Sequence, residues 1–334
     1  MSVQITPSFI LQFEDNLQYL FEDTWASVLQ ELIWDRFMRQ MPSSGRTEYY
    51  SWMLNAAGIQ PLGNGGRFPL EDLFEVSHKI ENEEFGTALE LERNSIEDAD
   101  GKGIQRGAQW AQQIAGEEAY WPQDGLFRLV EEGEDQPAYD GVNFFHVAHP
   151  VNPVLGPEAG TYANLLTNAP LTPSNFARAI AYIKTIRGPN NKPRKLIPRT
   201  LVVSPYQELT AKEILVAQTL GRDGPTEFGA QDNVLRTYGF NPPVAAHELT
   251  VDGHWYIGCE VIGYALPAFI YQVRRPFKLN SFSHLDQAQL DVMKKFRWTF
   301  DGRNQVEYGH PFLFFKFKPT GPGLSLADFE TIVS

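Results

Sequence analysis

The feature that most constrains this chain is an alternation of two kinds of residue between positions 73 and 93. Every second side chain there is polar, which is typical of strands with one buried face. The positions on the other face are Phe74, Val76, His78, Ile80, Leu89 and Leu91. The pattern predicts two strands joined as a hairpin around residues 82–86. A two-stranded ribbon buries too little surface to be stable alone, so this one needs a surface to lie on.

Helical spacing is predicted on both sides of the ribbon. Thr6, Pro7 and Ser8 form a helix start, and apolar residues follow at helical spacing as far as Ile33. A second helix is expected over residues 95–133, with acids in its first turn that complement the helix dipole. Pro122 should kink or restart it, because proline has no backbone N–H to donate.

The second half of the chain alternates between helix and strand. Helices are predicted over residues 176–183 and 209–220, with a buried strand at 201–203 between them. Later segments favour strands, and a turn is predicted at Asp301 and Gly302. These strands cover residues 255–258, 268–273, 292–300 and 312–317. The chain is therefore predicted to be an α+β protein.

Composition narrows the function classes. With 334 residues and 43% hydrophobic content the chain can fill a core, whereas its net charge of -13 argues against nucleic-acid binding as its main task. The single cysteine, Cys259, cannot form an intrachain disulfide. We find neither a secretory signal nor an apolar run of about 18 residues, so we expect a soluble protein made inside the cell, without a membrane partner.

Few residues are candidates for chemistry. His146 and His149, with the nearby Asp140, could serve a metal-dependent hydrolase, but Pro150 favours extended backbone and no third ligand lies close in sequence. We therefore favour a structural role for both histidines.

Other motifs fail on inspection. The acids at 98–100 lack the ligands of a calcium loop, because Lys102 and Gln109 stand where carboxylates are needed. The glycines at 63–66 do not complete a dinucleotide fingerprint, and no Walker A loop or nucleophile elbow occurs. No catalytic residue, metal ligand or cofactor site is predicted.

One basic run remains open. Residues 184–199 contain six bases and no acid, so the run could contact phosphate, form a solvated loop or contact another subunit. Its members are Lys184, Arg187, Lys192, Arg194, Lys195 and Arg199.

Specific residues resemble the Mu-like prophage major head subunit family. The similarity runs over most of residues 5–170, and the order of its motifs is distinctive. The matching positions are Glu48, Tyr49, Tyr50, Trp52 and Leu54; Phe74, Ile80, Asn82, Phe85 and the sequence RNSIEDADG at 93–101; and Tyr139, Asp140, Gly141, Phe144, Phe145 and His149.

This resemblance implies the Hong Kong 97-like phage major capsid fold. Its parts would be an N-terminal arm at 1–59, an extended hairpin loop at 60–94, a spine helix with the peripheral domain at 95–169, an axial domain at 170–265, and a return to the peripheral domain with a C-terminal tail at 266–334.

The resemblance also implies a structural protein and not an enzyme. Copies would assemble as pentamers and hexamers into an icosahedral shell around packaged double-stranded DNA, held without sequence specificity. Scaffold, portal and decoration proteins would be further partners; the protein would be made in the host cytoplasm and end in the virion. The alternatives are another virion part, such as a tail or baseplate protein, and the metal-dependent hydrolase.

Charge is segregated along the chain in a way that suggests an assembly contact. Residues 61–100 hold eleven acids and three bases, whereas residues 266–318 hold nine bases and four acids. We expect the acidic hairpin of one subunit to lie across basic strands of its neighbour. The alternative is that the acids only keep the free subunit soluble. The candidate inter-subunit contacts are Glu81, Glu83, Glu84, Glu90, Glu92, Arg274, Arg275, Lys278, Lys294 and Lys295.

Overall fold

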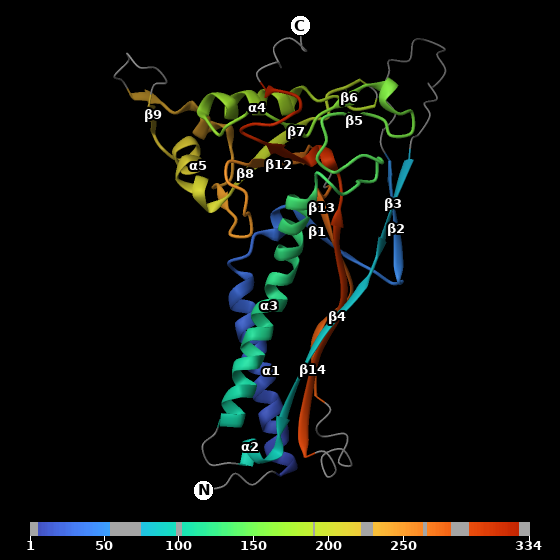
Figure 1. The fold of residues 1–334 in the computed structure, drawn as a ribbon, viewed down its shortest axis with the longest axis vertical. Helices are drawn as coiled ribbons and strands as arrows, with labels where there is room; N and C mark the ends of the chain where they lie inside the picture. The colour runs from blue at the N-terminus through green and yellow to red at the C-terminus, as the bar shows by residue number, and fades with distance from the viewer. Residues whose placement is uncertain are drawn as a thin grey trace, which may run out of the picture. The chain divides into compact units, whose positions relative to one another are not determined.

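The structure is a computed structural model of the 334-residue chain. It describes residues 6–53, 75–97, 102–189, 191–221, 230–262, 266–281 and 294–326. The chain forms two compact units, each of which joins distant parts of the sequence (Figure 1). Unit 1 comprises Met1–Glu48, Ile80–Leu126 and Tyr271–Glu307, and unit 2 comprises Tyr49–Lys79, Phe127–Ile270 and Tyr308–Ser334.

Unit 1 combines helices with a four-stranded sheet in the order β1-β13-β14-β4. Its first helix begins where the sequence predicted, because the Thr6 hydroxyl accepts a hydrogen bond from the backbone N–H of Phe9 at 3.2 Å and Pro7 follows it. Its elements are α1 (Pro7–Leu29), η1 (Trp34–Arg36), β1 (Met38–Pro42), β4 (Glu83–Glu92), α2 (Arg93–Glu97), and most of α3 (Lys102–Glu132), β13 (Phe269–Ser281) and β14 (Lys295–Tyr308).

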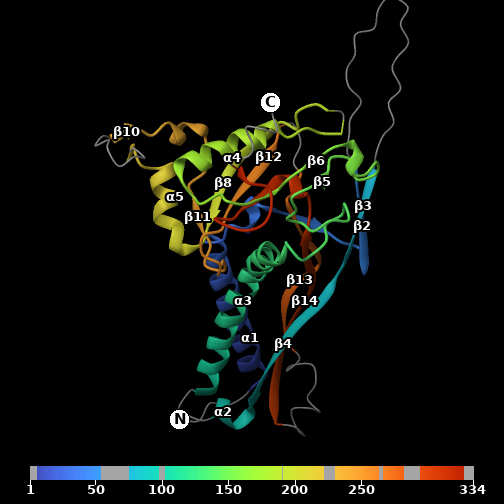
Figure 2. The same cartoon turned by 45° about the horizontal axis from the view of Figure 1, so that its top comes forward.

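The core of unit 1 lies between these helices and the sheet. In Figures 1 and 2, α1 and the part of α3 in this unit lie side by side along the β4 and β14 strands. Side chains of β14 alternate between buried and partly exposed, as a strand with one covered face requires. The buried residues that pack together here are Phe13, Leu17, Leu91, Ile96, Ala111, Phe296 and Trp298.

The predicted hairpin between residues 74 and 92 is wrong, although both of its strands exist. β3 (Glu75–Glu81) pairs with β2 (Thr47–Met53), whereas β4 pairs with β14. Asn82 lies between the two strands, and its side chain bonds to Ser43, Gly45 and Gln272 at 2.8–2.9 Å. These bonds hold the buried amide where a turn was expected, so each strand takes a partner from elsewhere in the sequence.

The turn predicted at Asp301 and Gly302 is also wrong, because β14 runs through both residues. A side chain at Gly302 would come within 2.5 Å of the Phe277 ring. The glycine therefore allows close packing of an aromatic ring on the strand and does not reverse the chain.

The helix predicted over 95–133 is present as α2 and α3, and residues 98–101 lie outside the described part of the chain. Helix α3 continues through Pro122, so the helix does not restart there, and the kink given as the other possibility stays a prediction. The glycines at 63–66 and part of the predicted extended loop also fall outside the described residues.

Unit 2 is organised around a mixed five-stranded sheet in the order β11-β8-β12-β15-β7, and Figure 2 shows α4 over it. β12 pairs antiparallel with β8 and β15, whereas β11 and β7 pair parallel with their neighbours. The elements are β2, β3, β5 (His149–Pro150), η2 (Pro157–Ala159), β6 (Thr161–Tyr162), β7 (Leu165–Leu166), α4 (Pro173–Thr185), β8 (Leu196–Val203), η3 (Pro205–Gln207), α5 (Glu208–Leu215), β9 (Thr219–Gly221), β10 (Ala230–Asp232), η4 (Val234–Tyr238), β11 (Val244–Ala245), β12 (Trp255–Val261), η5 (Pro311–Leu313) and β15 (Phe314–Phe317).

Aromatic residues fill the centre of unit 2. Trp255 of β12 stacks on Phe317 of β15 with ring centroids 4.0 Å apart, and Phe144 stacks on Tyr308 at 4.5 Å. The helix predicted at 176–183 and the strand at 201–203 are confirmed, whereas the helix predicted to reach Leu220 ends at Leu215. No helix within the described ranges is long and apolar enough to cross a membrane. The α+β prediction is confirmed.

Candidate assembly surfaces

A charged strip runs along the outer strand of the unit 1 sheet. Glu90 of β4 faces Arg297 of β14 in the strand register, and its carboxylate accepts hydrogen bonds from Arg297 Nε at 2.9 Å and Lys295 Nζ at 3.1 Å. The hydrogen bond from Arg297, and then that from Lys295, lowers the pKa of Glu90. Both partners are fixed because β4 and β14 are adjacent strands.

Two further ion pairs belong to the same unit. The guanidinium of Arg275 lies 2.7 Å from the Glu84 carboxylate and also contacts that of Asp301. Arg46 pairs with Glu81 at 2.7 Å. All of these side chains are substantially exposed, so water screens their attraction.

These contacts give two of the candidate acids basic partners within their own chain. Glu84 and Glu90 were expected to find basic partners on a neighbouring subunit, but the structure pairs them with Arg275, Lys295 and Arg297 of the same chain. The physical reason is the β4–β14 ladder, which brings the acidic and basic segments together before any second copy is needed.

Other predicted contact residues are differently placed. Arg274 donates a hydrogen bond to the Ser43 carbonyl at 3.3 Å. Glu83, Glu92, Lys278 and Lys294 are exposed and make no ion pair with another described residue. Their role as inter-subunit contacts stays a prediction.

The charged strip lies at the edge of the unit 1 sheet, because β4 is an outer strand. β4 is the last strand of its four-stranded sheet, and in the described part of the chain its only ladder partner is β14. An outer strand presents backbone N–H and C=O groups on its open side, and charged side chains are a common way to limit unwanted pairing there.

A buried polar network lies in unit 2 around His149. The side chains of His149 and Asp140 are 0% and 1% exposed, and His149 Nδ1 lies 2.6 Å from Asp140 Oδ2. The other ring nitrogen, Nε2, lies 3.0 Å from Asn164 Oδ1 and 3.1 Å from the Phe144 carbonyl. Both ring nitrogens thus face oxygen atoms of the protein.

Asn164 fixes this orientation. Its amide nitrogen donates to the carbonyls of Phe144 at 2.7 Å and Pro311 at 3.1 Å, so its oxygen must be the atom that faces His149. The same oxygen accepts the backbone N–H of His146 at 2.8 Å. The network therefore ties the residues around 140–149 to the start of β15.

This geometry speaks against the alternative of a metal-dependent hydrolase. Both nitrogens of His149 lie against oxygen atoms of the protein in a fully buried site, which leaves no open position for a metal ion. The ring centroids of His146 and His149 are 5.9 Å apart, and His146 Nδ1 accepts the backbone N–H of Ala148. Among the described residues no group of three possible ligands forms a metal site.

A second buried charge lies in the unit 2 sheet. The Lys316 side chain is 4% exposed, and its Nζ lies 2.7 Å from Glu134 Oε1. Burial lowers the pKa of Lys316. Burial alone would raise the pKa of Glu134, but the hydrogen bonds from Lys316 and Lys318 outweigh it and lower this pKa. This ion pair was not predicted, because Glu134 and Lys316 are distant in sequence.

An exposed apolar patch covers three adjoining elements of unit 2. Helix α5 contacts both η3 and η4, and each of these segments presents large apolar side chains to solvent. Tyr206 is 78% exposed, Leu209 71% and Val234 64%. Exposed apolar side chains on elements that contact one another are candidates for a protein interface. We refer to Tyr206, Leu209, Val216, Val234 and Tyr238 as the apolar patch.

Two family models match the chain. One, described as Mu-like prophage major head subunit gpT, matches residues 11–169, and the other, described as phage capsid protein, matches residues 138–298. The chain is thus similar to the Mu-like major head subunit family over residues 11–169. The major capsid protein of Escherichia phage Mu is 26% identical to it over 215 residues, which is 64% of this chain and 66% of that relative. The chain thus spans slightly less than two thirds of the relative's length.

Solved structures with the same fold are phage capsids. A chain from the procapsid of bacteriophage JBD30 aligns with a TM-score of 0.52 and 18% identity, covering 98% of this chain and 80% of that one. A chain from the capsid of cyanophage P-SCSP1u aligns with a TM-score of 0.54 and 10% identity, covering 86% and 87%. The predicted Hong Kong 97-like fold is confirmed.

Proposed function

We propose that this chain is the subunit that forms the shell of a phage head by assembly with copies of itself. The observation that carries the proposal is the match to the Mu-like major head subunit family, together with a capsid fold that aligns over 98% of the chain. In finer detail, the copies form pentamers and hexamers of an icosahedral shell that encloses double-stranded DNA. Scaffold, portal and decoration proteins are its further partners, and synthesis takes place in the host cytoplasm.

The acidic character of the subunit supports the role of a container. A net charge of -13 repels the phosphate backbone, so the shell would hold DNA without gripping it. Packing and release of the genome then require no sequence-specific contacts to be broken.

Electron microscopy of the expressed protein tests this function. Closed shells, pentamers or hexamers are the expected products. Open tubes would indicate a tail or baseplate protein instead, and a monomer that stays inert over a range of protein and salt concentrations would contradict self-assembly.

We propose the apolar patch as one contact between copies. Its side chains cost free energy when they face water, and a second copy of the same chain can cover them. Replacing Leu209 with aspartate should prevent capsomer formation, as measured by size-exclusion chromatography with light scattering. Val251→Asp is the matched control, because Val251 is also exposed, at 46%, but lies in a separate loop. Equal assembly of both variants would remove the patch from the interface.

The charged strip is proposed as a second contact. Glu83 and Glu92 have no basic partner among the described residues of their own chain, so they are better placed than Glu84 and Glu90 to meet a neighbour. Changing both to lysine should weaken shell assembly and alter its dependence on salt.

The control for this experiment is Asp252→Lys, which reverses an exposed charge in a turn of unit 2. A shell that assembles with the same yield and the same salt dependence in the double variant as in this control would contradict the contact. Glu90→Lys serves as a comparison, because it should disturb the β4–β14 pairing within the subunit itself.

A further inference from the structure

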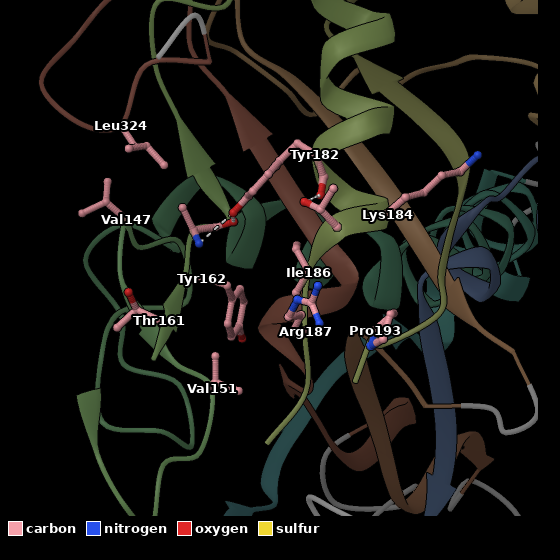
Figure 3. A pocket seen from close by; sticks show the side chains of 12 residues that line it. Val147, Val151, Thr161, Tyr162, Tyr182, Lys184, Ile186, Arg187, Pro193 and Leu324 are labelled. Atoms are coloured by element: carbon pink, nitrogen blue, oxygen red, sulfur yellow. Dashed lines mark hydrogen bonds between the residues drawn. The ribbon is translucent and has the colours of Figure 1, made fainter. Parts of the chain in front are cut away.

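A cavity of about 590 Å³ opens in unit 2 between the end of α4 and the segment around β6 (Figure 3). Figure 3 shows Tyr162 near its centre, with Val147 and Leu324 on one side and Ile186 and Arg187 on the other. Pockets that enclose a ligand have volumes of about 300–1,000 Å³, so this cavity has room for more than one side chain. It lies outside the charged strip and the apolar patch.

The walls of the cavity are mainly apolar and are held in place by packing. Tyr162, Tyr182 and Ile186 are all buried. The Tyr182 hydroxyl donates to the Ala163 carbonyl at 2.6 Å and accepts the Ala163 N–H at 2.9 Å, which satisfies its polar atom. The walls are therefore preformed and suited to aliphatic side chains.

The rim of the cavity carries positive charge. Lys184 and Arg187 are lining residues, and no lining residue is acidic. The Lys184 ammonium lies over the Tyr238 ring at 5.1 Å, and Figure 3 shows it pointing away from the cavity. The Arg187 guanidinium donates to the Asn191 carbonyl at 2.8 Å and makes no ion pair with another described residue. Arg187 is therefore the cation that can meet an acidic group from outside.

A loop beside the cavity has complementary properties. Residues 152–160, which we call the aliphatic loop, connect β5 to β6 and contain one acid, Glu158, and no base. Val154 is 54% exposed and Leu155 58%, and Glu158 is exposed as well. In the part of the chain that the structure describes, Glu158 has no ion-pair partner. The loop thus offers two aliphatic side chains and one carboxylate to a partner.

Hydrogen bonds hold the aliphatic loop in its shape. The Asn152 side chain accepts the backbone N–H of Val154 at 3.1 Å, and the Asn152 carbonyl accepts that of Gly156 at 2.9 Å. The Val151 N–H donates to the Gly160 carbonyl at 2.9 Å and closes the loop at its base. Because this backbone is already held in place, a partner that covers the loop has little of the chain to order.

The aliphatic loop does not fill the cavity of its own chain. Val151 and Thr161 flank the loop and line the cavity, whereas Val154, Leu155 and Glu158 do not line it and are exposed. A second copy can bring the same loop to the cavity from outside. The charges then match, because the loop is acidic and every charged lining residue is basic.

We propose that the aliphatic loop of one copy docks in the cavity of a neighbouring copy. Val154 and Leu155 contact the apolar walls, and the Glu158 carboxylate faces Arg187. Burial of the two aliphatic side chains supplies affinity, and the charge pair orients the loop. Loop and cavity are different surfaces, so a copy that gives its loop to one neighbour can receive the loop of another, as a ring of subunits requires. The inference rests on the proposed function, since it names one contact through which the copies assemble.

Disulfide trapping between two singly substituted chains tests the contact. Both full-length chains carry Cys259→Ala; one has Ala159→Cys in the loop, and the other has Thr185→Cys in the cavity wall. The chains are co-expressed, and their shells are isolated and treated with a mild oxidant. The expected product is a disulfide between the two chains, identified by mass spectrometry from linked peptides that contain positions 159 and 185. Each chain has one cysteine, so an intrachain bond cannot form.

The matched control places the wall cysteine elsewhere on the same helix. Ser174→Cys replaces Thr185→Cys, because Ser174 is exposed near the other end of α4 and does not line the cavity. Its yield of linked chains should be much lower, since cysteines whose Cα atoms are more than about 7 Å apart cannot be bridged.

A change in the loop tests the apolar part of the contact. Leu155→Asp in the loop chain should lower the yield of linked chains about tenfold, because the cavity offers a carboxylate little water. Ile262→Asp changes another exposed aliphatic residue, outside the loop and the cavity lining, and should leave the yield unchanged. Loss of shells with Leu155→Asp but not with Ile262→Asp would support the contact equally.

A charge swap tests the orientation of the loop. Arg187→Glu in the wall chain should lower the yield about threefold, because an ion pair is replaced by repulsion. Arg178→Glu, at an exposed position of α4 outside the cavity lining, should leave it unchanged. Glu158→Lys in the loop chain should restore the yield when it is combined with Arg187→Glu. Circular dichroism checks that each variant keeps its fold.

The possible failures have different meanings. Shells in which the yield does not exceed that of the Ser174 control would overturn the docking and leave the role as a shell subunit intact. The same holds for folded variants in which neither Leu155→Asp nor Arg187→Glu changes the yield. A protein that forms neither shells nor linked chains would contradict the proposed function, and the docking with it.

Discussion

Units 1 and 2 both contain acidic side chains that contact basic ones, but those at the sheet edge of unit 1 are exposed to water and those around His149 in unit 2 are buried. In unit 1, Glu90 and its partners Lys295 and Arg297 are 36%, 45% and 47% exposed at the sheet edge. In unit 2, His149 and Asp140 are almost fully buried. Water screens the first set and cannot reach the second, so the loss of one partner should matter little in unit 1 and greatly in unit 2.

The two arrangements also serve different purposes. The exposed pairs line up acids and bases across adjacent strands and so favour one register of β4 on β14. The buried network fixes the positions of loops and strand ends, because every donor and acceptor in it is committed to a partner. An exposed charged side chain is free to change its ion-pair partner on contact with another molecule, whereas a buried one stabilises the fold of its own chain.

Among these substitutions, removal of Asp140 should lower the free energy of unfolding the most. Asp140→Ala leaves the His149 ring buried without its carboxylate, which should destabilise the free subunit by about 3–5 kcal/mol. Denaturant unfolding, followed by tryptophan fluorescence, measures this loss. Asp135→Ala, at an exposed position nearby, is the control, and an equal response in both variants would mean that the buried pair contributes nothing special.

The Glu134–Lys316 pair should come next. Glu134→Ala strands a buried ammonium, although Glu134 itself is partly exposed, so we expect a loss of about 2–3 kcal/mol in the same unfolding assay. The double variant Glu134→Ala with Lys316→Met should recover part of this loss, since no buried charge remains. If the double variant is less stable than Glu134→Ala alone, the stranded charge is not the cause.

Acid should destabilise unit 2 through His310. This ring is 2% exposed, neither of its nitrogens has a hydrogen-bond partner among the described residues, and burial lowers its pKa to about 3. In the unfolded chain this ring takes up a proton near pH 6.5. Above that pH the ring is neutral in both states, and its full contribution to the free energy of unfolding is present. As the pH falls from 6.5 toward 3, the free energy of unfolding decreases by up to about 1.4 kcal/mol for each pH unit.

The substitution His310→Phe isolates this pH dependence. It should keep the aromatic contacts with Trp52 and Phe312 and flatten the loss of stability between pH 6 and pH 3. Urea midpoints measured across this range provide the test. A variant with the same acid sensitivity as the parent would assign the effect to other groups, such as His254, whose pKa is lowered to about 4 mainly by burial.

The smallest effect is expected at Glu90. Glu90→Gln removes an exposed charge that Arg297 and Lys295 share, and the folded subunit should unfold at nearly the same denaturant concentration. The small difference should shrink further in high salt. Glu83→Gln on the same strand, where Asn304 is the facing residue, is the control. A loss as large as that of Asp140→Ala would erase the contrast between the two units.

Part of the fold could be predicted because its signals are local. Thr6 and Pro7 define the start of α1 through hydrogen bonds within one helical turn. The apolar spacing that predicted α4 likewise depends on residues at most a few turns apart. The family resemblance was visible from short motifs in order along the chain, and it led to the correct fold.

The errors in strand pairing and at the predicted turn concern partners that are distant in sequence. The alternation that predicted β3 and β4 is a property of each strand alone, and it says nothing of which strand lies beside it. The aspartate–glycine pair at 301–302 is a frequent turn signal, but the Phe277 ring packed on Gly302 gives the glycine a different purpose. Likewise, the sequence favoured a structural role for the histidines near residue 146, but the partners of His149, Asp140 and Asn164, were visible only in the structure.

The sequence by itself indicated the resemblance to a family, several of the helices and strands of both units and the segregation of acidic from basic residues. Only the tertiary structure decided that β4 pairs with β14, that acids of the strip meet bases of the same chain, and that a cavity opens beside Leu324. The reason is physical. Helix caps and periodicity depend on neighbours along the chain, whereas strand pairing, burial of charge and cavities depend on which distant segments the whole fold brings together.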